Sequence, residues 1–337
     1  MKRFDGFMFG ANLGGWLSQF DEDTKEHFDS FITEKDIVRI KEAGFDHVRV
    51  PVDYVVIEDE QGEPIESGYE YLENCVEWCR RAGLNMVLDL HKAYGYSFDP
   101  LDKGESKEAF FYDEKLQKRF YNTWDTISKR FAKDADMMAL ELLNEIVSPK
   151  VVKEWNEIAK QAALTIRKNT KDAYIIVGGV CYNNVTSVPL LDKPIDDRIV
   201  YNFHCYEPFI FTHQRAYWVE NMPKDFVVEY PGSLEDYREK SKELSPDLAD
   251  AINRGEITEI GPSYFERIFV PAVEKAKAED VCLYCGEYGV IELADVESAK
   301  RWFADIHSVF EKYEIGHAVW NYKEKDFGAT VNKCFFK

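Results

Sequence analysis

The sequence contains no long hydrophobic run. No segment reaches the roughly 20 apolar residues that a membrane-spanning helix needs. The first residues, MKRFDGFMFGANLGGW, also lack the apolar stretch of roughly 7 to 15 residues found in a signal peptide. We therefore expect no membrane partner, and a cytoplasmic location unless a leader has been removed from the chain.

Positive charge is scarce relative to negative charge. The chain has 62 acidic residues against 42 lysines and arginines, which gives a formal net charge of −20. Nucleic acids and anionic membranes are negatively charged and would be repelled, so we expect no nucleic-acid partner. A neutral or cationic substrate is compatible with this charge, whose main effect is on solubility. We expect a monomer.

The cysteines cannot form a complete set of disulfides, because their number, seven, is odd. We expect reduced and mostly buried thiols. The segment CLYC at residues 282–285 has the spacing of half a zinc site, but it lies in a strand-like run and no second C-x-x-C motif occurs. We predict neither a metal site nor a cofactor.

Strand-like and helix-like segments alternate along nearly the whole chain. Eight short runs are typical of strands: FMFGANL, HVRVPV, NMVLDLH, MMALELLNE, YIIVGGV, IVYNFHCY, CLYCGEYGV and GHAVWNY. Amphipathic segments with helix signals lie between them, such as one that starts at Thr33 and stops at Gly44, and one that stops at Gly83. This pattern predicts a (β/α)8 TIM barrel, with residues 1–337 as a single domain. A doubly wound open sheet is the alternative, but no glycine-rich nucleotide motif follows the first strand.

Two parts of the chain depart from a regular barrel. Residues 207–262 are far longer than a usual connection after a strand, and contain a helical pattern in LEDYREKSKELSPDLADAIN. We predict that they form an inserted subdomain near the barrel mouth. After the eighth strand only KEKDFGATVNKCFFK remains, without a clear helical period, so we expect the eighth helix to be short or absent.

Polar and aromatic residues gather at the C-terminal ends of the predicted strands, where barrel enzymes carry their chemistry. These residues are Asn12, Trp16, Arg49, Asp53, His91, Asn144, Glu145, His204, Tyr206, Glu287 and Trp320. Glu145 belongs to strand four and Glu287 to strand seven, so they lie on opposite sides of the barrel mouth. Two opposed carboxylates are what hydrolysis of a glycosidic bond requires, and aromatic rings suit the apolar faces of sugars. A single histidine or tryptophan would more often be structural, and it is the joint placement that indicates a sugar-cleaving site.

Six motifs occur in the order found in one known enzyme family. They are NLGGW, FDHVRVPVDY, VLDLH, LELLNE, YNFHCYEPFIFTHQ and YCGEYGV. With them the chain resembles the family 5 glycoside hydrolases, a cellulase-type group of retaining (β/α)8 enzymes, from GANLGGWL to AVWNYKEKDF. It looks most like a leaderless endoglucanase branch with an inserted subdomain after strand six.

The resemblance implies a role for each matching residue. Glu145 would be the acid/base and Glu287 the nucleophile, with their carboxyl groups about 5 to 5.5 Å apart as in retaining enzymes. Asn144 would bind the sugar 2-hydroxyl, and Arg49 and Tyr206 would keep Glu287 ionised. The remaining expected substrate contacts are Asn12, His91, His204, Trp218 and Trp320.

One departure from the common pattern is Ile146, since many relatives have proline after Asn-Glu. Glu145 is expected to be partly desolvated and protonated near neutral pH.

Four functions remain to be separated. The first is a retaining endo-β-glucanase that hydrolyses β-1,4 or mixed-linkage β-glucan, or cello-oligosaccharides. An exo-acting β-1,3-glucosidase is suggested by NLGGW, and a β-mannanase is a further alternative because the residues that read the 2-hydroxyl in neighbouring subsites cannot be identified. The last, from another class, is a sugar-binding barrel without turnover, although such modules usually lose at least one of the two carboxylates.

Overall fold

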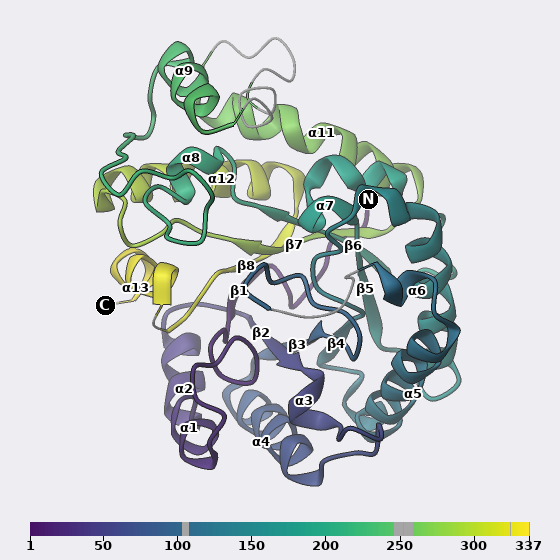
Figure 1. Cartoon of the computed structure of the whole chain (residues 1–337). Helices are drawn as coiled ribbons and strands as arrows, with labels where there is room; N and C mark the ends of the chain where they lie inside the picture. The colour runs from purple at the N-terminus through teal and green to yellow at the C-terminus, as the bar shows by residue number, and fades with distance from the viewer. Residues whose placement is uncertain (103–107, 246–251, 253–258, 324, 337) are drawn as a thin grey trace.

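The computed structural model describes residues 1–102, 108–245, 252, 259–323 and 325–336. Eight parallel strands pair in chain order, and β8 pairs with β1 to close the barrel (Figure 1). The strands are β1 (Phe9–Asn12), β2 (His47–Asp53), β3 (Asn85–Lys92), β4 (Met138–Glu141), β5 (Tyr174–Gly178), β6 (Ile199–Cys205), β7 (Cys282–Tyr288) and β8 (Gly316–Val319). The predicted (β/α)8 barrel is therefore confirmed.

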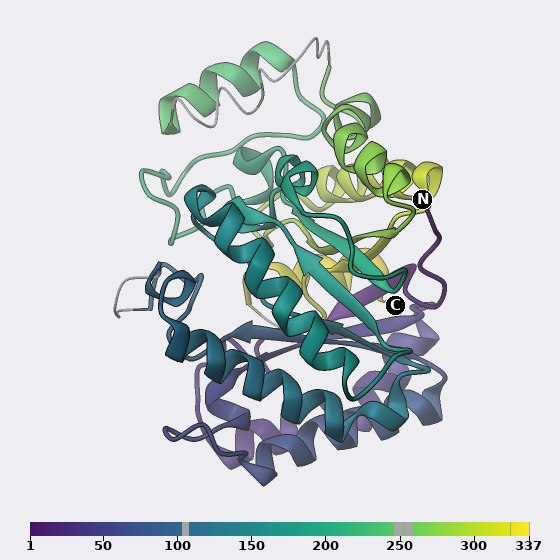
Figure 2. The ribbon, with the colours of Figure 1, turned by 90° about the vertical axis from the view of Figure 1, so that its right-hand side faces the viewer.

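Helices surround the barrel (Figures 1 and 2). The α-helices are α1 (Lys25–Ser30), α2 (Glu34–Glu42), α3 (Tyr54–Ile57), α4 (Glu66–Ala82), α5 (Glu114–Arg130), α6 (Val152–Arg167), α7 (Val180–Asn183), α8 (Phe209–Thr212), α9 (Leu234–Leu244), α11 (Pro262–Ala278), α12 (Val296–Tyr313) and α13 (Gly328–Phe335). Short 3-10 helices are η1 (Ala109–Phe111), η2 (Ala132–Asp134), η3 (Pro149–Val151), η4 (Val185–Leu190) and η5 (Lys325–Phe327). No helix in the described ranges has the length and apolar character needed to cross a bilayer.

The helix ends follow the sequence signals. The Thr33 amide donates to the Asp36 carboxylate at 2.8 Å in a capping box that starts α2. Helix α4 ends at Gly83, whose φ of 69° is in the left-handed region that glycine tolerates. These local signals fix where each helix stops, and so which strand comes next at the barrel wall.

The inside of the barrel has an apolar floor and a polar upper layer. The floor contains Phe4, Phe7, Val87, Ala139, Ile176, Val200, Cys282, Tyr284 and Ala318, all buried. Residues at the next inward positions are polar, and they are Asn12, Arg49, Asp89, Glu141 and Asn202. Since a floor of hydrocarbon excludes water from below, the polar layer must satisfy its charges internally or from the cleft above.

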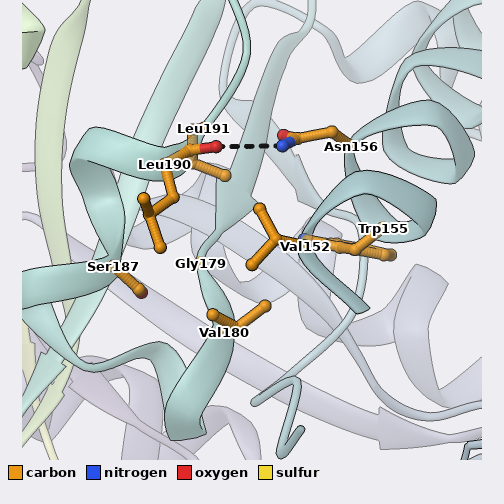
Figure 3. A pocket seen from close by; sticks show the side chains of 8 residues that line it. All are labelled: Val152, Trp155, Asn156, Gly179, Val180, Ser187, Leu190 and Leu191. Atoms are coloured by element: carbon orange, nitrogen blue, oxygen red, sulfur yellow. Dashed lines mark hydrogen bonds between the residues drawn. The ribbon is translucent and has the colours of Figure 1, made fainter. Parts of the chain in front are cut away.

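The connection between β5 and β6 lacks a long helix, which the sequence pattern did not reveal. Helix η4 covers this position, and a small pocket lies between it and α6 (Figure 3). The Asn156 side chain of α6 ties the two together, because its amide donates to the Leu190 carbonyl at 2.9 Å and its oxygen accepts from the Asp192 amide at 3.0 Å. The shorter covering element leaves α7 close to the barrel mouth.

Three expectations need comment. Strand β4 ends at Glu141, so the predicted strand MMALELLNE was too long, and Glu145 lies on the turn that follows. The eighth helix is present as the short α13. Within 207–262, α9 lies at the outer edge of the molecule beyond α8 (Figures 1 and 2), and the rest of its predicted helix, except Ser245 and Ile252, lies outside the described residues.

Candidate active site

A cleft of about 970 Å³ opens at the C-terminal ends of the strands. Both glutamates line it, together with side chains from the connections that follow β1, β3, β5, β6 and β8. Aromatic residues contribute much of its surface, and they are Phe20, Phe31, Phe98, Tyr182, Tyr206, Phe209, Tyr217, Trp218, Trp320 and Phe327. A cleft with this lining suits a carbohydrate, whose rings have apolar faces and polar edges.

The NLGGW motif shapes one wall of this cleft. A side chain on Gly14 would come within 2.8 Å of the Trp320 ring, so only glycine lets the backbone pass that close. Gly15 has a φ of 83°, a conformation that favours glycine. The Trp320 ring is also parallel to the His91 ring, with centroids 5.7 Å apart and an interplanar angle of 2°. The motif therefore keeps one face of the cleft flat.

Glu145 sits on a turn rather than on a strand. Its φ is 39°, which is unusual for a residue with a side chain, and that side chain is 12% exposed. His204 Nδ1 lies 2.8 Å from Glu145 Oε1, and the Asn183 amide lies 3.4 Å from the other ring nitrogen, Nε2. Since that amide can only donate, Nδ1 carries the histidine hydrogen and donates to Glu145. Burial, reinforced by the negative charge of Glu287, raises the pKa of Glu145 well above its ordinary value.

Glu287 lies within β7 and receives two strong hydrogen bonds. Arg49 Nη1 donates to Oε1 at 2.8 Å, and the Tyr206 hydroxyl donates to Oε2 at 2.9 Å. The sequence argument predicted that these contacts would keep the carboxylate ionised, and both oppose protonation. Burial is nevertheless the larger effect, and it raises the pKa of Glu287 above its ordinary value. No cation lies in hydrogen-bond contact with Glu145 among the described residues, so none opposes the rise of its pKa in this way.

The two carboxylates are close together. An oxygen of Glu145, an oxygen of Glu287 and a ring nitrogen of His204 all lie within 4.8 Å of one another. Such a triad resembles a metal site in composition, but the facing atoms of His204 and Glu145 already form a hydrogen bond with each other at 2.8 Å. In the cysteine pair considered for zinc, Cys282 packs in the barrel floor and Cys285 in the outer core, so the two side chains lie on opposite faces of β7. The Glu145–Glu287 spacing is short enough for one group to attack a sugar while the other transfers a proton.

Arg49 holds the polar layer together. It is fully buried, and its guanidinium donates to both carboxylate oxygens of Glu141 at 2.7 and 2.9 Å. It also lies 3.0 Å from Asp89, in addition to its contact with Glu287. One cation cannot neutralise three carboxylates, and burial raises the pKa of Asp89 and of Glu141 to about 7 each. Arg49 therefore orients Glu287 from below rather than touching the cleft itself.

Asn144 lies behind the cleft lining and has one unpaired donor among the described residues. Its carbonyl oxygen accepts from Arg49 at 2.9 Å, while its amide nitrogen is buried and has no acceptor among the described residues. A buried amide without an acceptor is costly, and a ligand hydroxyl would satisfy it. His91 is held by Asp89 at 2.5 Å, and burial lowers the pKa of His91 to about 3, so a neutral imidazole lines the cleft.

Asn12 does not reach the cleft, which corrects its prediction as a substrate contact. It is fully buried and donates to backbone carbonyls of β7 and β8, among them that of Gly286 at 2.9 Å. Its own oxygen accepts from Arg49 at 2.9 Å. Trp16 is also fully buried and donates to the Phe28 carbonyl at 2.9 Å. Asn12 ends β1 and Trp16 follows it, but both act in the scaffold.

The first part of the segment 207–262 reaches the cleft. Phe209, Tyr217 and Trp218 line it, and Trp218 packs with Tyr206, Trp320 and Phe327 in one small cluster. Phe211, from the same segment, is instead fully buried in the main core. Trp218 is thus placed where a sugar could contact its ring.

Several site residues were missed from the sequence. Asp89, Glu141 and Asn202 form the network under the glutamates, and a signal for them exists: Asp89 and His91, like Asn202 and His204, are two residues apart and share one face of a strand. Tyr182 lies in the cleft on a backbone whose residues 181–183 all have φ between 52° and 57°. No sequence signal marks such a turn when it contains no glycine.

The chain is similar to proteins of one family. The family model described as cellulase (glycosyl hydrolase family 5) matches residues 11–326. The chain is 42% identical over 324 residues to Endoglucanase C of Acetivibrio thermocellus, covering 95% of this chain and 92% of that protein. It is 39% identical over 315 residues to Cellodextrinase A of Ruminococcus flavefaciens, covering 94% and 85%. The crystal structure of endoglucanase Cel5A from Thermotoga maritima has the same fold, with a TM-score of 0.76, 22% identity and coverage of 98% and 97%.

Proposed function

Because the chain belongs to glycosyl hydrolase family 5, we propose that it is a retaining endo-β-glucanase acting on β-1,4 or mixed-linkage β-glucan and on cello-oligosaccharides. It is a glycoside hydrolase by this membership. The observation that carries the retaining mechanism is the approach of Glu145 and Glu287 to within 4.8 Å, because inverting enzymes keep their carboxyl groups roughly 6.5 to 9.5 Å apart to admit a water.

The environments of the two glutamates support different roles. Glu145 has the strongly raised pKa and holds the proton that the departing glycosidic oxygen takes up. Glu287 has Arg49 and Tyr206 to stabilise its charge, and attacks the anomeric carbon. The C–O bond to the leaving sugar breaks as the bond to Glu287 forms. Glu145, now ionised, then takes a proton from water, whose oxygen displaces Glu287 and restores the β-configuration.

The remaining cleft residues support binding. We assign the amide of Asn144, which has no acceptor among the described residues, as the donor to the sugar 2-hydroxyl, a contact that strengthens as the ring flattens toward the transition state. Trp320 offers a flat ring stacked on His91 for the glycone-side sugar. The names of the relatives, an endoglucanase and a cellodextrinase, favour glucan over mannan for this chain.

Product analysis on four polysaccharides tests the proposal. Barley glucan and carboxymethylcellulose should be cut internally, with a rapid fall in viscosity, while laminarin and mannan should give little product. Proton NMR of the first product should show the β-anomer. Glucose released one unit at a time from laminarin would indicate the exo-β-1,3-glucosidase, and preferred mannan cleavage the mannanase. Binding without any product from the four substrates would mean a non-hydrolytic barrel.

A further inference from the structure

The turn that carries Glu145 is held by hydrogen bonds from several neighbouring segments. Beyond β4 the chain leaves the strand ladder, and residues 142–147 follow an irregular path. The Asn144 amide donates to the Leu90 carbonyl of β3 at 3.1 Å. On the other side of Glu145, the Ile146 carbonyl accepts from the Tyr182 amide at 3.0 Å. The Glu145 carbonyl lies between these two attachments, and the Val147 amide directly follows the second.

One side-chain hydroxyl satisfies both of those groups. The Tyr96 hydroxyl donates to the Glu145 carbonyl at 2.7 Å and accepts from the Val147 amide at 3.0 Å. It thereby closes the turn across Ile146 in the way that a strand neighbour would. Because Tyr96 is only 4% exposed and burial raises its pKa far above the ordinary value, the hydroxyl stays neutral and can keep both roles.

The Tyr96 side chain is itself rigidly placed. It ends a tight turn after β3 in which the Tyr96 amide donates to the Ala93 carbonyl at 2.8 Å. Gly95 in this turn has a φ of 84°, and a side chain there would come within 2.8 Å of Leu116. The ring packs against Phe110 and Phe111, with centroids 5.8 and 5.5 Å away. The hydroxyl is therefore delivered to a fixed point behind the Glu145 turn.

We propose that Tyr96 is a positioning residue that holds the Glu145 carboxyl in line with the leaving-group oxygen. The inference rests on the proposed function, in which Glu145 is the acid/base. Without the hydroxyl, a buried carbonyl and a buried amide lose their partners, and the strained Glu145 backbone relaxes. Glu287 has no contact with Tyr96 and is held separately by Arg49 and Tyr206. The loss should therefore fall on proton transfer and spare nucleophilic attack.

Tyr96→Phe tests this through the leaving group. We expect kcat/KM for cellotetraose to fall about 10- to 100-fold, because small misplacement of a catalytic group costs up to about 10²-fold. With dinitrophenyl cellobioside, whose phenol departs without a proton, kcat/KM should change less than about threefold, because general acid catalysis contributes little there. The alkaline limb of the cellotetraose pH profile, which reports Glu145, should also move, while the acidic limb stays.

Two further variants make the result decisive. Tyr201→Phe is the control, because the Tyr201 hydroxyl lies away from the cleft and donates to the Asp192 carbonyl at 2.8 Å. This variant should leave the ratio of kcat/KM for the two substrates unchanged. Gly95→Ala keeps the Tyr96 hydroxyl but displaces its turn, and should give a smaller loss with the same leaving-group dependence. The proposal is overturned if both Tyr96→Phe and Gly95→Ala lose activity equally on both substrates, or lose none. A wild-type protein that cleaves neither substrate would instead refute the proposed function.

Discussion

The backbone that carries Glu145 differs from the backbone that carries Glu287. Glu287 lies inside β7, where His204 of β6 is its ladder partner, so the sheet register decides where its side chain points. Glu145 lies beyond the end of β4 with a positive φ, and its turn is held by side-chain and loop contacts. Both reach the same cleft and approach within 4.8 Å, but by different physical means.

This difference matches the chemistry proposed for each group. A nucleophile must approach one carbon along one line, and a position within a closed barrel offers the most rigid support. An acid/base first gives a proton to the leaving sugar and then takes one from a water molecule. This role requires a raised pKa, which a neighbouring cation would lower. Glu145 accordingly has a neutral histidine as its neighbour, whereas Glu287 has an arginine and a tyrosine. The turn also lets residues outside the sheet tune the acid/base alone.

The largest effect is expected when each carboxylate is removed in turn, which tests the different roles proposed for Glu145 and Glu287. Glu287→Ala should reduce turnover of both glucan and an activated aryl glucoside by several orders of magnitude, since attack is needed whatever departs. Glu145→Ala should reduce glucan cleavage by about 10²- to 10⁴-fold and affect the aryl substrate far less. Azide should rescue Glu145→Ala to a β-product and Glu287→Ala to an α-product, read by NMR. The opposite pattern would show that the two roles are reversed.

A smaller effect should separate the two limbs of the pH profile. Tyr206→Phe removes the hydroxyl that donates to Glu287 at 2.9 Å. A hydrogen bond to the ionised form lowers a carboxylate pKa, so its loss raises the pKa of Glu287 further. The acidic limb of the pH profile should therefore move to higher pH, and kcat/KM measured near that limb should fall about tenfold. The alkaline limb should stay in place, and Tyr237→Phe, whose hydroxyl donates to the Glu229 carbonyl, serves as the control. A shift of the alkaline limb instead would assign Tyr206 to Glu145.

The smallest expected effect concerns the aromatic residues proposed to line the cleft on either side. Tyr182 is bonded through its amide to the Glu145 turn, and Trp218 packs beside Tyr206, the partner of Glu287. Replacing either with alanine should raise KM for long cello-oligosaccharides about 2- to 10-fold, the loss of one ring contact, and leave kcat nearly unchanged. If KM for long oligosaccharides is unaltered in one variant, the ring removed in that variant does not contact the sugar substrate.

The sequence was sufficient for the barrel because each strand is a short apolar run between helix signals. It was also sufficient for most strand-end residues, since the C-terminal ends of parallel strands meet at one face. The length of β4 could not be predicted, and the reason is physical. Leu142 and Leu143 continue the apolar run although the strand has ended, because the irregular turn is buried as deeply as the strand. An apolar pattern reports burial, not hydrogen bonding.

Depth within the barrel was also beyond the sequence. Asn12 and Trp320 lie at strand ends on the same face of the barrel, yet Asn12 is buried in the polar layer and Trp320 borders the cleft. The sequence pattern predicts where a strand ends, but not how deep in the barrel the side chain at that end lies. Tyr96 and Tyr182 were missed for another reason, since both act from loops whose conformation depends on tertiary contacts.

The contacts of Arg49 have a consequence for how the chain acquires its structure. Its guanidinium bonds to residues 37, 92 and 238 positions away along the chain. A partly assembled barrel that lacked β7 would leave Arg49 and its carboxylate partners on β3 and β4 open to water. Half-barrel intermediates are therefore disfavoured, because the last strands to join complete both the sheet and the buried ion pairs of Arg49. We expect unfolding to be cooperative across the two halves, so that the proposed catalytic centre and the closed barrel are lost in the same transition.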